Sequence, residues 1–148
     1  MLTKEILSNI LSSEGVTEIQ SDAQIIEAEG LDAIMELLMN LRGLDDGPCL
    51  VLEGRSNGSI QLIDGPVDTY TESIWVMERV GRGETESEVY ARTFTLMKKI
   101  LRALVAKVNL QQGMEGWRWQ RTTYMKRYGG PDARGWEMVL TFMDDQDI

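Results

Sequence analysis

The feature that most constrains the fold is one long amphipathic segment, Thr85 to Val108. It opens with a capping box, in which the Thr85 hydroxyl accepts the Glu88 amide proton and the Glu88 carboxylate accepts the Thr85 amide proton. Apolar residues then recur every three or four positions, which is the spacing of one buried helix face. We therefore predict a helix over residues 85–108. Its covered face consists of Val89, Thr93, Leu96, Met97, Ile100, Leu101, Leu104, Val105 and Val108.

Strand-like segments on both sides of this helix supply the covering surface. Ser73 to Val80 is mostly apolar on both faces, as in a central strand, and Trp117 to Tyr128 alternates aromatic and basic residues. In Trp136 to Met143 one face holds only large apolar residues, and this last strand pairs antiparallel with its predecessor. The predicted fold class is α+β, with a mainly antiparallel sheet of about five strands covered by one long helix. The apolar face of the last strand comprises Trp136, Met138, Leu140 and Phe142.

Two further strands, Cys49 to Glu53 and Ile60 to Ile63, are predicted to form a hairpin. A two-residue turn at Asn57-Gly58 and a three-residue loop with Gly58 in the left-handed conformation are both possible. We favour the three-residue loop, which pairs Leu52 with Leu62 and Val51 with Ile63. A second turn is predicted at Asp64-Gly65-Pro66.

Residues 1–43 form an amino-terminal helical region in this prediction. A short apolar stripe from Leu2 to Leu11 indicates a first helix that ends at Gly15, and a second helix runs from about Leu31 to Arg42. Between them, Ser21 or Asp22 caps a turn through Ile25 and Ile26. With the sheet and long helix over 48–143, the chain is expected to be one α+β domain over 1–148.

The composition argues against several classes of function. A net charge of −9 opposes general binding to nucleic acid or to an anionic membrane. Histidine is absent, which removes the commonest general base and transition-metal ligand, and Cys49 lies in an apolar run typical of a buried strand. We therefore expect no enzyme activity, no catalytic residue, no cofactor and no metal site.

The amino terminus, Met1-Leu2-Thr3-Lys4-Glu5, has no basic region followed by an apolar one, and no segment has the length to span a bilayer. These observations predict a protein that stays in the cytoplasm and has no membrane partner.

Basic and acidic residues are separated near the carboxyl terminus, in a basic stretch and an acidic tail. This separation suits a head-to-tail contact between subunits of a ring, although a solvated, self-neutralising hairpin in a monomer explains it nearly as well. Single-stranded nucleic acid is a weaker alternative, because the net charge opposes it. The candidate interaction residues are Arg118, Arg121, Lys126, Arg127 and Arg134 in the stretch and Asp144, Asp145 and Asp147 in the tail.

The order of elements resembles the tail-terminator and tail-completion (head-tail joining) proteins of tailed bacteriophages. The likeness covers nearly the whole chain as a pattern: a helical start, a strand entered through Gly47-Pro48, a hairpin, one long helix, and a closing strand from Gly135 to Phe142. The sequence Pro48-Cys49-Leu50-Val51 contributes to it, whereas the region from Leu2 to Arg42 is longer than the family pattern.

The resemblance implies a structural subunit of a phage or prophage tail that self-associates as a homo-oligomer and contacts tail-tube and neck proteins in an assembled virion. The family has no catalytic motif to carry over. A small cytoplasmic ligand-binding or regulatory α+β domain is the alternative function, and it requires a concave pocket with convergent polar groups.

Overall fold

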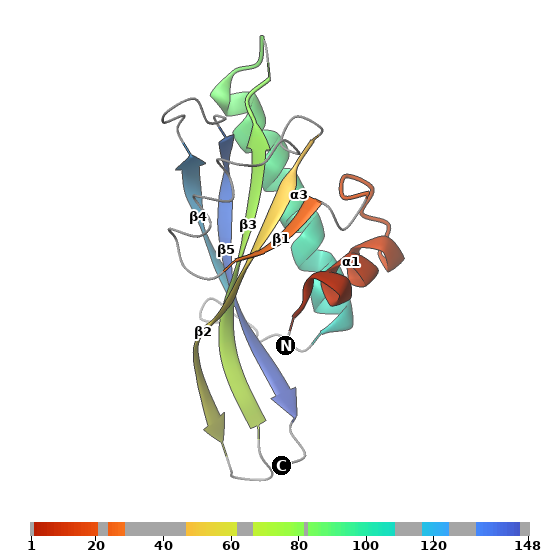
Figure 1. The fold of residues 1–148 in the computed structure, drawn as a ribbon, viewed down its shortest axis with the longest axis vertical. Coiled ribbons are helices and arrows are strands. Elements are labelled where there is room, and N and C mark those ends of the chain that lie inside the picture. Colours follow the sequence, from red (N-terminus) through yellow and green to blue (C-terminus); the bar gives the residue numbers. More distant parts are fainter. Residues whose placement is uncertain are drawn as a thin grey trace.

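The computed structural model describes residues 2–20, 24–28, 47–61, 67–81, 83–108, 117–124 and 133–145. For residues 28, 54–61, 67–70, 117–124 and 143–145 it describes the backbone alone. In Figure 1 the described helices lie on one side of a long twisted sheet, which confirms the predicted α+β class. The elements are α1 (Lys4–Ser13), β1 (Ile25–Ala28), β2 (Cys49–Gln61), β3 (Val67–Arg79), α3 (Glu86–Lys107), β4 (Trp117–Tyr124) and β5 (Ala133–Asp145).

The long helix α3 forms where the sequence predicts it. The Glu88 amide donates to the Thr85 hydroxyl over 3.2 Å, and the Thr85 amide donates to the Glu88 carboxylate over 3.3 Å. Both bonds satisfy amides that have no partner within the helix. The buried side chains of α3 are those of Val89, Tyr90, Thr93, Leu96, Met97, Ile100, Ala103 and Leu104.

The buried face of α3 is narrower than predicted at three positions. Val105 is 40% exposed, and Leu101 and Val108 are only partly buried. The prediction that these residues belong to the covered face is therefore wrong for Val105 and only partly right for Leu101 and Val108. Leu101 and Val105 lie at the margin of the stripe centred on Met97, Ile100 and Leu104, and Val108 follows the last residue of the helix.

The sheet has the strand order β1-β2-β3-β5-β4. Strands β1 and β2 are parallel, and the other neighbouring pairs are antiparallel. The central position predicted for the segment Ser73–Val80 is confirmed by β3, and the antiparallel pairing of the last strand with its predecessor is confirmed by β5 and β4. In addition, β5 pairs with β3 from Ala133 to Asp145, so β3 and β5 are both internal strands.

The predicted hairpin around Asn57-Gly58 is wrong. Residues 49–61 form one strand, in which Leu52 lies opposite Ile74 and Gly58 lies opposite Tyr70. The register shifts between Glu53 and Asn57, so the glycine- and serine-rich stretch forms an irregularity inside a strand rather than a turn. The long pairing with β3 outweighs the local turn preference. The predicted turn at 64–66 lies outside the described residues.

The amino-terminal region contains one helix that the sequence predicts, α1, and one strand that it does not predict, β1. Thr3 caps α1 by accepting the Ile6 amide, and Gly15 follows the helix with a φ of 74°, as predicted. Residues 25–28 are not a turn, because they pair parallel with β2. A sequence of four residues is too short to be assigned to a strand rather than a turn when the strand that it pairs with is not known. The helix predicted over 31–42 lies outside the described residues.

The core lies between the helices and one face of the sheet. The predicted alternation in the last strand is confirmed, because Met138, Leu140 and Phe142 are buried in this core and Trp136 packs against it. Side chains on the opposite face of the sheet are buried as well: Cys49, Val51, Trp75 and Met77. The core cluster also includes Leu7 and Leu11 of α1, Leu50 of β2, Ile74 and Val76 of β3, and Ile100 and Leu104 of α3.

Candidate functional site

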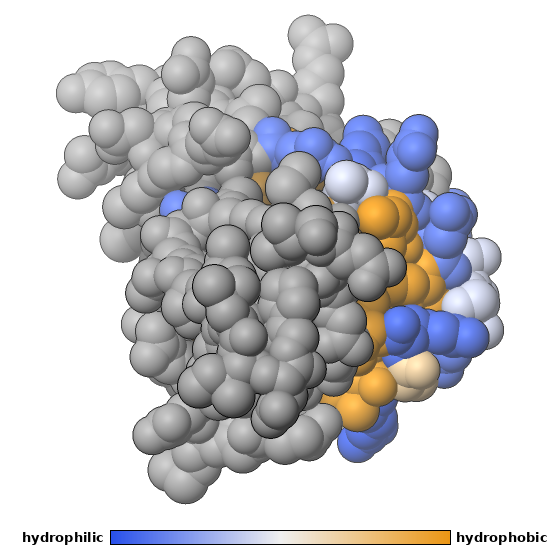
Figure 2. Space-filling model, turned by 90° about the horizontal axis from the view of Figure 1, so that it is seen from below, coloured by the Kyte–Doolittle hydropathy of each residue, from blue (hydrophilic) through white to orange (hydrophobic). Residues whose placement is uncertain are grey.

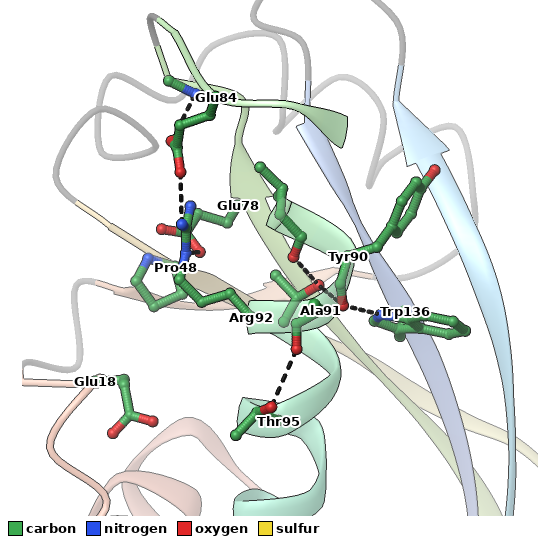
Figure 3. Close-up of polar contacts among 12 residues, drawn as sticks. Glu18, Pro48, Glu78, Glu84, Tyr90, Ala91, Arg92, Thr95 and Trp136 are labelled. Atoms are coloured by element: carbon green, nitrogen blue, oxygen red, sulfur yellow. Dashed lines mark hydrogen bonds and ion pairs between the residues drawn. The ribbon is translucent and has the colours of Figure 1, made fainter. Parts of the chain in front are cut away.

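Arg92 on α3 connects the helix to the end of β3 (Figure 3). Its guanidinium bonds the Glu78 carboxylate over 2.8 Å and also pairs with Glu84, whose other oxygen accepts the Gly81 amide. The hydrogen bond from Arg92 lowers the pKa of Glu84, and the two carboxylates raise the pKa of Arg92. The Arg92 side chain is 45% exposed, so this network holds the helix start against β3 with only modest energy.

A groove of about 420 Å³ lies beside this network. The ammonium group of Lys99 pairs with Glu18 over 2.8 Å at its rim, and this hydrogen bond lowers the pKa of Glu18. Both cations in the groove, Lys99 and Arg92, are therefore already bound to carboxylates, and a small ligand would have to displace them. The groove lining consists of Glu18, Pro48, Glu78, Arg92, Thr95, Leu96 and Lys99.

Arg134 does not belong to an exposed basic surface, contrary to the prediction. It is 5% exposed, and its guanidinium bonds the Glu86 carboxylate over 2.8 Å. The same group donates to the Ala133 carbonyl over 3.1 Å. Because Glu86 lies in the first turn of α3, this pair ties β5 to the start of the helix. Arg134 is therefore a structural residue here.

Two of the remaining predicted cations lie in the edge strand β4, and the other two lie outside the described residues. Arg118 and Arg121 lie in β4, opposite Val139 and Trp136 of β5. An odd spacing puts positions 118 and 121 on opposite faces of the sheet, so they do not form one flat patch. Lys126, Arg127 and Asp147 lie outside the described residues.

Asp144 and Asp145 lie within β5 rather than in a separate acidic tail. In the register, Asp144 is directly opposite Asp68 of β3, and Asp145 is opposite Val67. Asp68 is not among the interaction residues predicted from the sequence. Only the pairing of β3 with β5 brings these residues together, and no spacing in the sequence signals it.

We call the end of the sheet that contains these aspartates the acidic arm. It comprises residues 58–61 of β2, 67–69 of β3 and 143–145 of β5. In Figure 1 this end of the three strands extends beyond the ends of α1 and α3, at the bottom of the view. Asp68, Asp144 and Asp145 are its charged residues. Asp68 and Asp144 therefore occupy directly opposed register positions at this end of the sheet.

A smaller apolar surface lies on the helical side of the molecule (Figure 2). An orange strip there is bordered by hydrophilic residues. Among the described residues, the large apolar side chains that are most exposed are Ile6 at 43% and Val105 at 40%. Two such residues on neighbouring helices are ordinary for a protein surface.

The described residues hold no group of three or more Cys, Asp or Glu side chains arranged to bind a metal ion. Cys49 is 3% exposed, as the sequence predicted, and burial raises the pKa of its thiol to about 12. Among the described helices, none has both the length and the apolar character required to cross a bilayer.

The raised pKa of Cys49 predicts a thiol that is unreactive in the folded protein. Thiolate is the reactive form, and at pH 8 a thiol with a pKa near 12 is almost entirely protonated. We expect iodoacetamide to label Cys49 at least about a hundred-fold more slowly in the native protein than in urea, with labelling followed by mass spectrometry. Equal rates in the two conditions would show that the thiol is accessible.

No protein-family model matches this chain, and no curated protein is significantly similar to it in sequence.

Proposed function

We propose that this chain is a non-enzymatic structural subunit that acts by associating with copies of itself and with other proteins of a phage or prophage tail or neck assembly. The observation that carries the proposal is the acidic arm, a three-stranded end of the sheet that extends beyond the helices. The resemblance of the element order to tail-terminator and tail-completion proteins supplies the biological setting.

The charge arrangement of the arm supports a protein partner. The register sets Asp68 opposite Asp144, and Asp145 follows, so this end of the sheet concentrates acidic positions that a basic partner would complement. Suitable cations occur in the same chain, because Arg118 and Arg121 lie in β4, the outermost strand on one side of the sheet. Complementary charges of this kind raise the specificity for the partner and the rate of association more than they raise the affinity.

The edges of the sheet support the same proposal, since no strand in the described part of the chain pairs with the outer side of β1 or of β4. An edge strand presents unpaired backbone amides and carbonyls, which readily pair with another chain. By contrast, the groove beside Arg92 supports ligand binding less well, since its cations are already engaged in ion pairs. Self-association therefore fits the described surfaces better than the regulatory-domain alternative does.

The proposal predicts that the purified protein forms assemblies larger than its 16.8 kDa chain. We expect the mass measured by light scattering to rise with protein concentration, and to fall in moderate salt. Salt screens exposed charges over about 8 to 10 Å, so a contact built on charge complementarity weakens. A mass of one chain at every concentration in low salt would contradict self-association.

A further inference from the structure

The groove beside Arg92 is built from four separate segments of the chain. Its apolar lining comes from Leu96 of α3 and from Pro48, which precedes β2. The side-chain amide of Gln24 links two of the walls, because it donates to the carbonyl of Glu18 over 3.1 Å and to that of Pro48 over 2.9 Å. The walls are therefore already linked before a partner binds, which lowers the entropic cost of binding.

Among the described residues at this groove, carboxylates outnumber cations. Arg92 pairs with both Glu78 and Glu84, and Lys99 pairs with Glu18. Three carboxylates therefore face two cations, which leaves one negative charge. An anion that entered the groove would have to displace a carboxylate from its cation, whereas a single cation would neutralise the excess.

Glu78 provides an acceptor for such a cation. Its Oε2 accepts from Arg92 Nε over 2.8 Å, and no described residue bonds its Oε1. Figure 3 shows this carboxylate near Pro48, another residue of the groove. The Glu78 side chain is only 15% exposed, so its carboxylate is partly withdrawn from water. A hydrogen bond from a cation to such an oxygen stabilises a complex more than a bond between neutral groups does.

The groove opens to the protein surface, so another protein can reach it. The side chains of Arg92 and Lys99 are 45% and 46% exposed, and Thr95, one helical turn from each, is exposed as well. The Thr95 hydroxyl donates to the Ala91 carbonyl over 3.1 Å, and its oxygen can still accept a hydrogen bond.

We propose that this groove receives a lysine side chain of a partner protein, whose ammonium group bonds Glu78 and whose aliphatic stem lies against Pro48 and Leu96. Lysine has an apolar stem that ends in a compact cation, and the groove has an apolar lining beside a carboxylate. An arginine fork suits two carboxylate oxygens, but Arg92 already bonds one oxygen of Glu78.

This contact surface is separate from the acidic arm, because Glu78 lies near the opposite end of β3 from residues 67–69. The proposal rests on the association with other proteins proposed above, and it specifies the chemistry of one partner.

A capped tripeptide, alanine-lysine-alanine, tests the groove on the full chain. Its neutral match contains norleucine in place of lysine, which keeps a four-carbon stem and lacks the ammonium group. In a nuclear magnetic resonance titration, we expect the lysine peptide to give saturable shifts of the backbone amide signals of Glu78 and Thr95. The norleucine peptide should bind at least about ten-fold more weakly. Equal binding of the two peptides would overturn the proposal.

Two variants separate the charge of the groove from its shape. Glu78→Gln removes the acceptor charge and should raise the dissociation constant of the lysine peptide at least about ten-fold. Thr95→Phe keeps every ion pair and places a large side chain in the groove, so it should also prevent binding, whereas Thr95→Ser should bind like the wild type. Circular dichroism checks that each variant folds.

Glu14→Gln is the matched control for the change of charge. Glu14 also pairs with a lysine, Lys107, and is 32% exposed, but it does not line the groove. Its loss should leave binding of the lysine peptide unchanged. If Glu14→Gln and Glu78→Gln weaken binding equally, the peptide is attracted only by the acidic protein as a whole, and the groove is rejected.

Light scattering keeps this inference apart from self-association. A wild type that assembles, with a folded Thr95→Phe variant that binds the lysine peptide as tightly as the wild type does, rejects the groove and leaves the self-association in place. A wild type that is always monomeric but binds the lysine peptide through Glu78 rejects the self-association and supports the groove.

Discussion

Replacing Gly135 with alanine is expected to lower the free energy of unfolding by about 3 kcal/mol or more. Gly135 lies in β5 opposite Met77, and a Cβ atom there would overlap the carbonyl oxygen of Val76. That oxygen belongs to the backbone of the central strand β3, which cannot move aside without disturbing its pairing on both sides. Urea unfolding followed by tryptophan fluorescence measures the change.

Gly15 offers the matched control for this substitution. It has a φ of 74°, but a Cβ atom there meets nothing within 4 Å. Gly15→Ala should therefore cost only the backbone strain of the left-handed conformation, about 1 to 2 kcal/mol. A Gly135→Ala variant that unfolds no more easily than Gly15→Ala would show that β3 and β5 tolerate a side chain at this close approach.

Truncating Leu104 to alanine is expected to cost about 2 to 5 kcal/mol, the usual range for a fully buried leucine. Leu104 is 0% exposed and packs in the core between α3 and the sheet. Leu101, one turn away on the same helix, is only partly buried and should lose less than about 2 kcal/mol when it is truncated. Thermal and urea unfolding of the two variants compare the same chemical change at two depths.

The order of these two effects tests the orientation of α3. A Leu101→Ala variant that is as destabilised as Leu104→Ala would mean that the buried face includes Leu101 as fully as Leu104, as the sequence predicts. Both variants keep the capping box at Thr85 and Glu88, so neither changes how the helix begins.

The acidic arm gathers acidic register positions at one end of the sheet, because Asp68 lies opposite Asp144 and Asp145 follows. Among the described residues, no strand pairs with the outer side of β4. An assembly that supplies cations and a pairing strand would complement both features. This is the physical reason for proposing a structural subunit, and it connects the arm of one copy with Arg118 and Arg121 of another.

Some features of the protein follow from short stretches of sequence. The bounds of α3 could be predicted, because its capping box joins Thr85 to Glu88 and its apolar repeat lies within one segment. The same holds for the termination of α1 at Gly15 and for the buried side chains of Met138, Leu140 and Phe142. Each of these depends on neighbours within a few positions, where side-chain spacing determines which face is buried.

Other features depended on partners far away in the chain. The turn preference of Asn57-Gly58 gave way to pairing with β3, and residues 25–28 became a strand because β2 lies beside them. Arg134 is buried by pairing with Glu86, which is 48 residues away, so its sequence context of other cations was misleading. The candidate site was only partly predictable for the same reason.

Local patterns in the sequence were enough to predict the helices α1 and α3 that the structure describes, the α+β class, the burial of Cys49 and the separation of charge between residues 118–121 and 144–145. The strand order, the burial of Arg134 and the position of Asp68 opposite Asp144 depend on long-range pairing and could not be predicted in this way. Helix caps and periodic faces are local interactions, whereas strand pairing joins residues whose separation in sequence carries no information about their register.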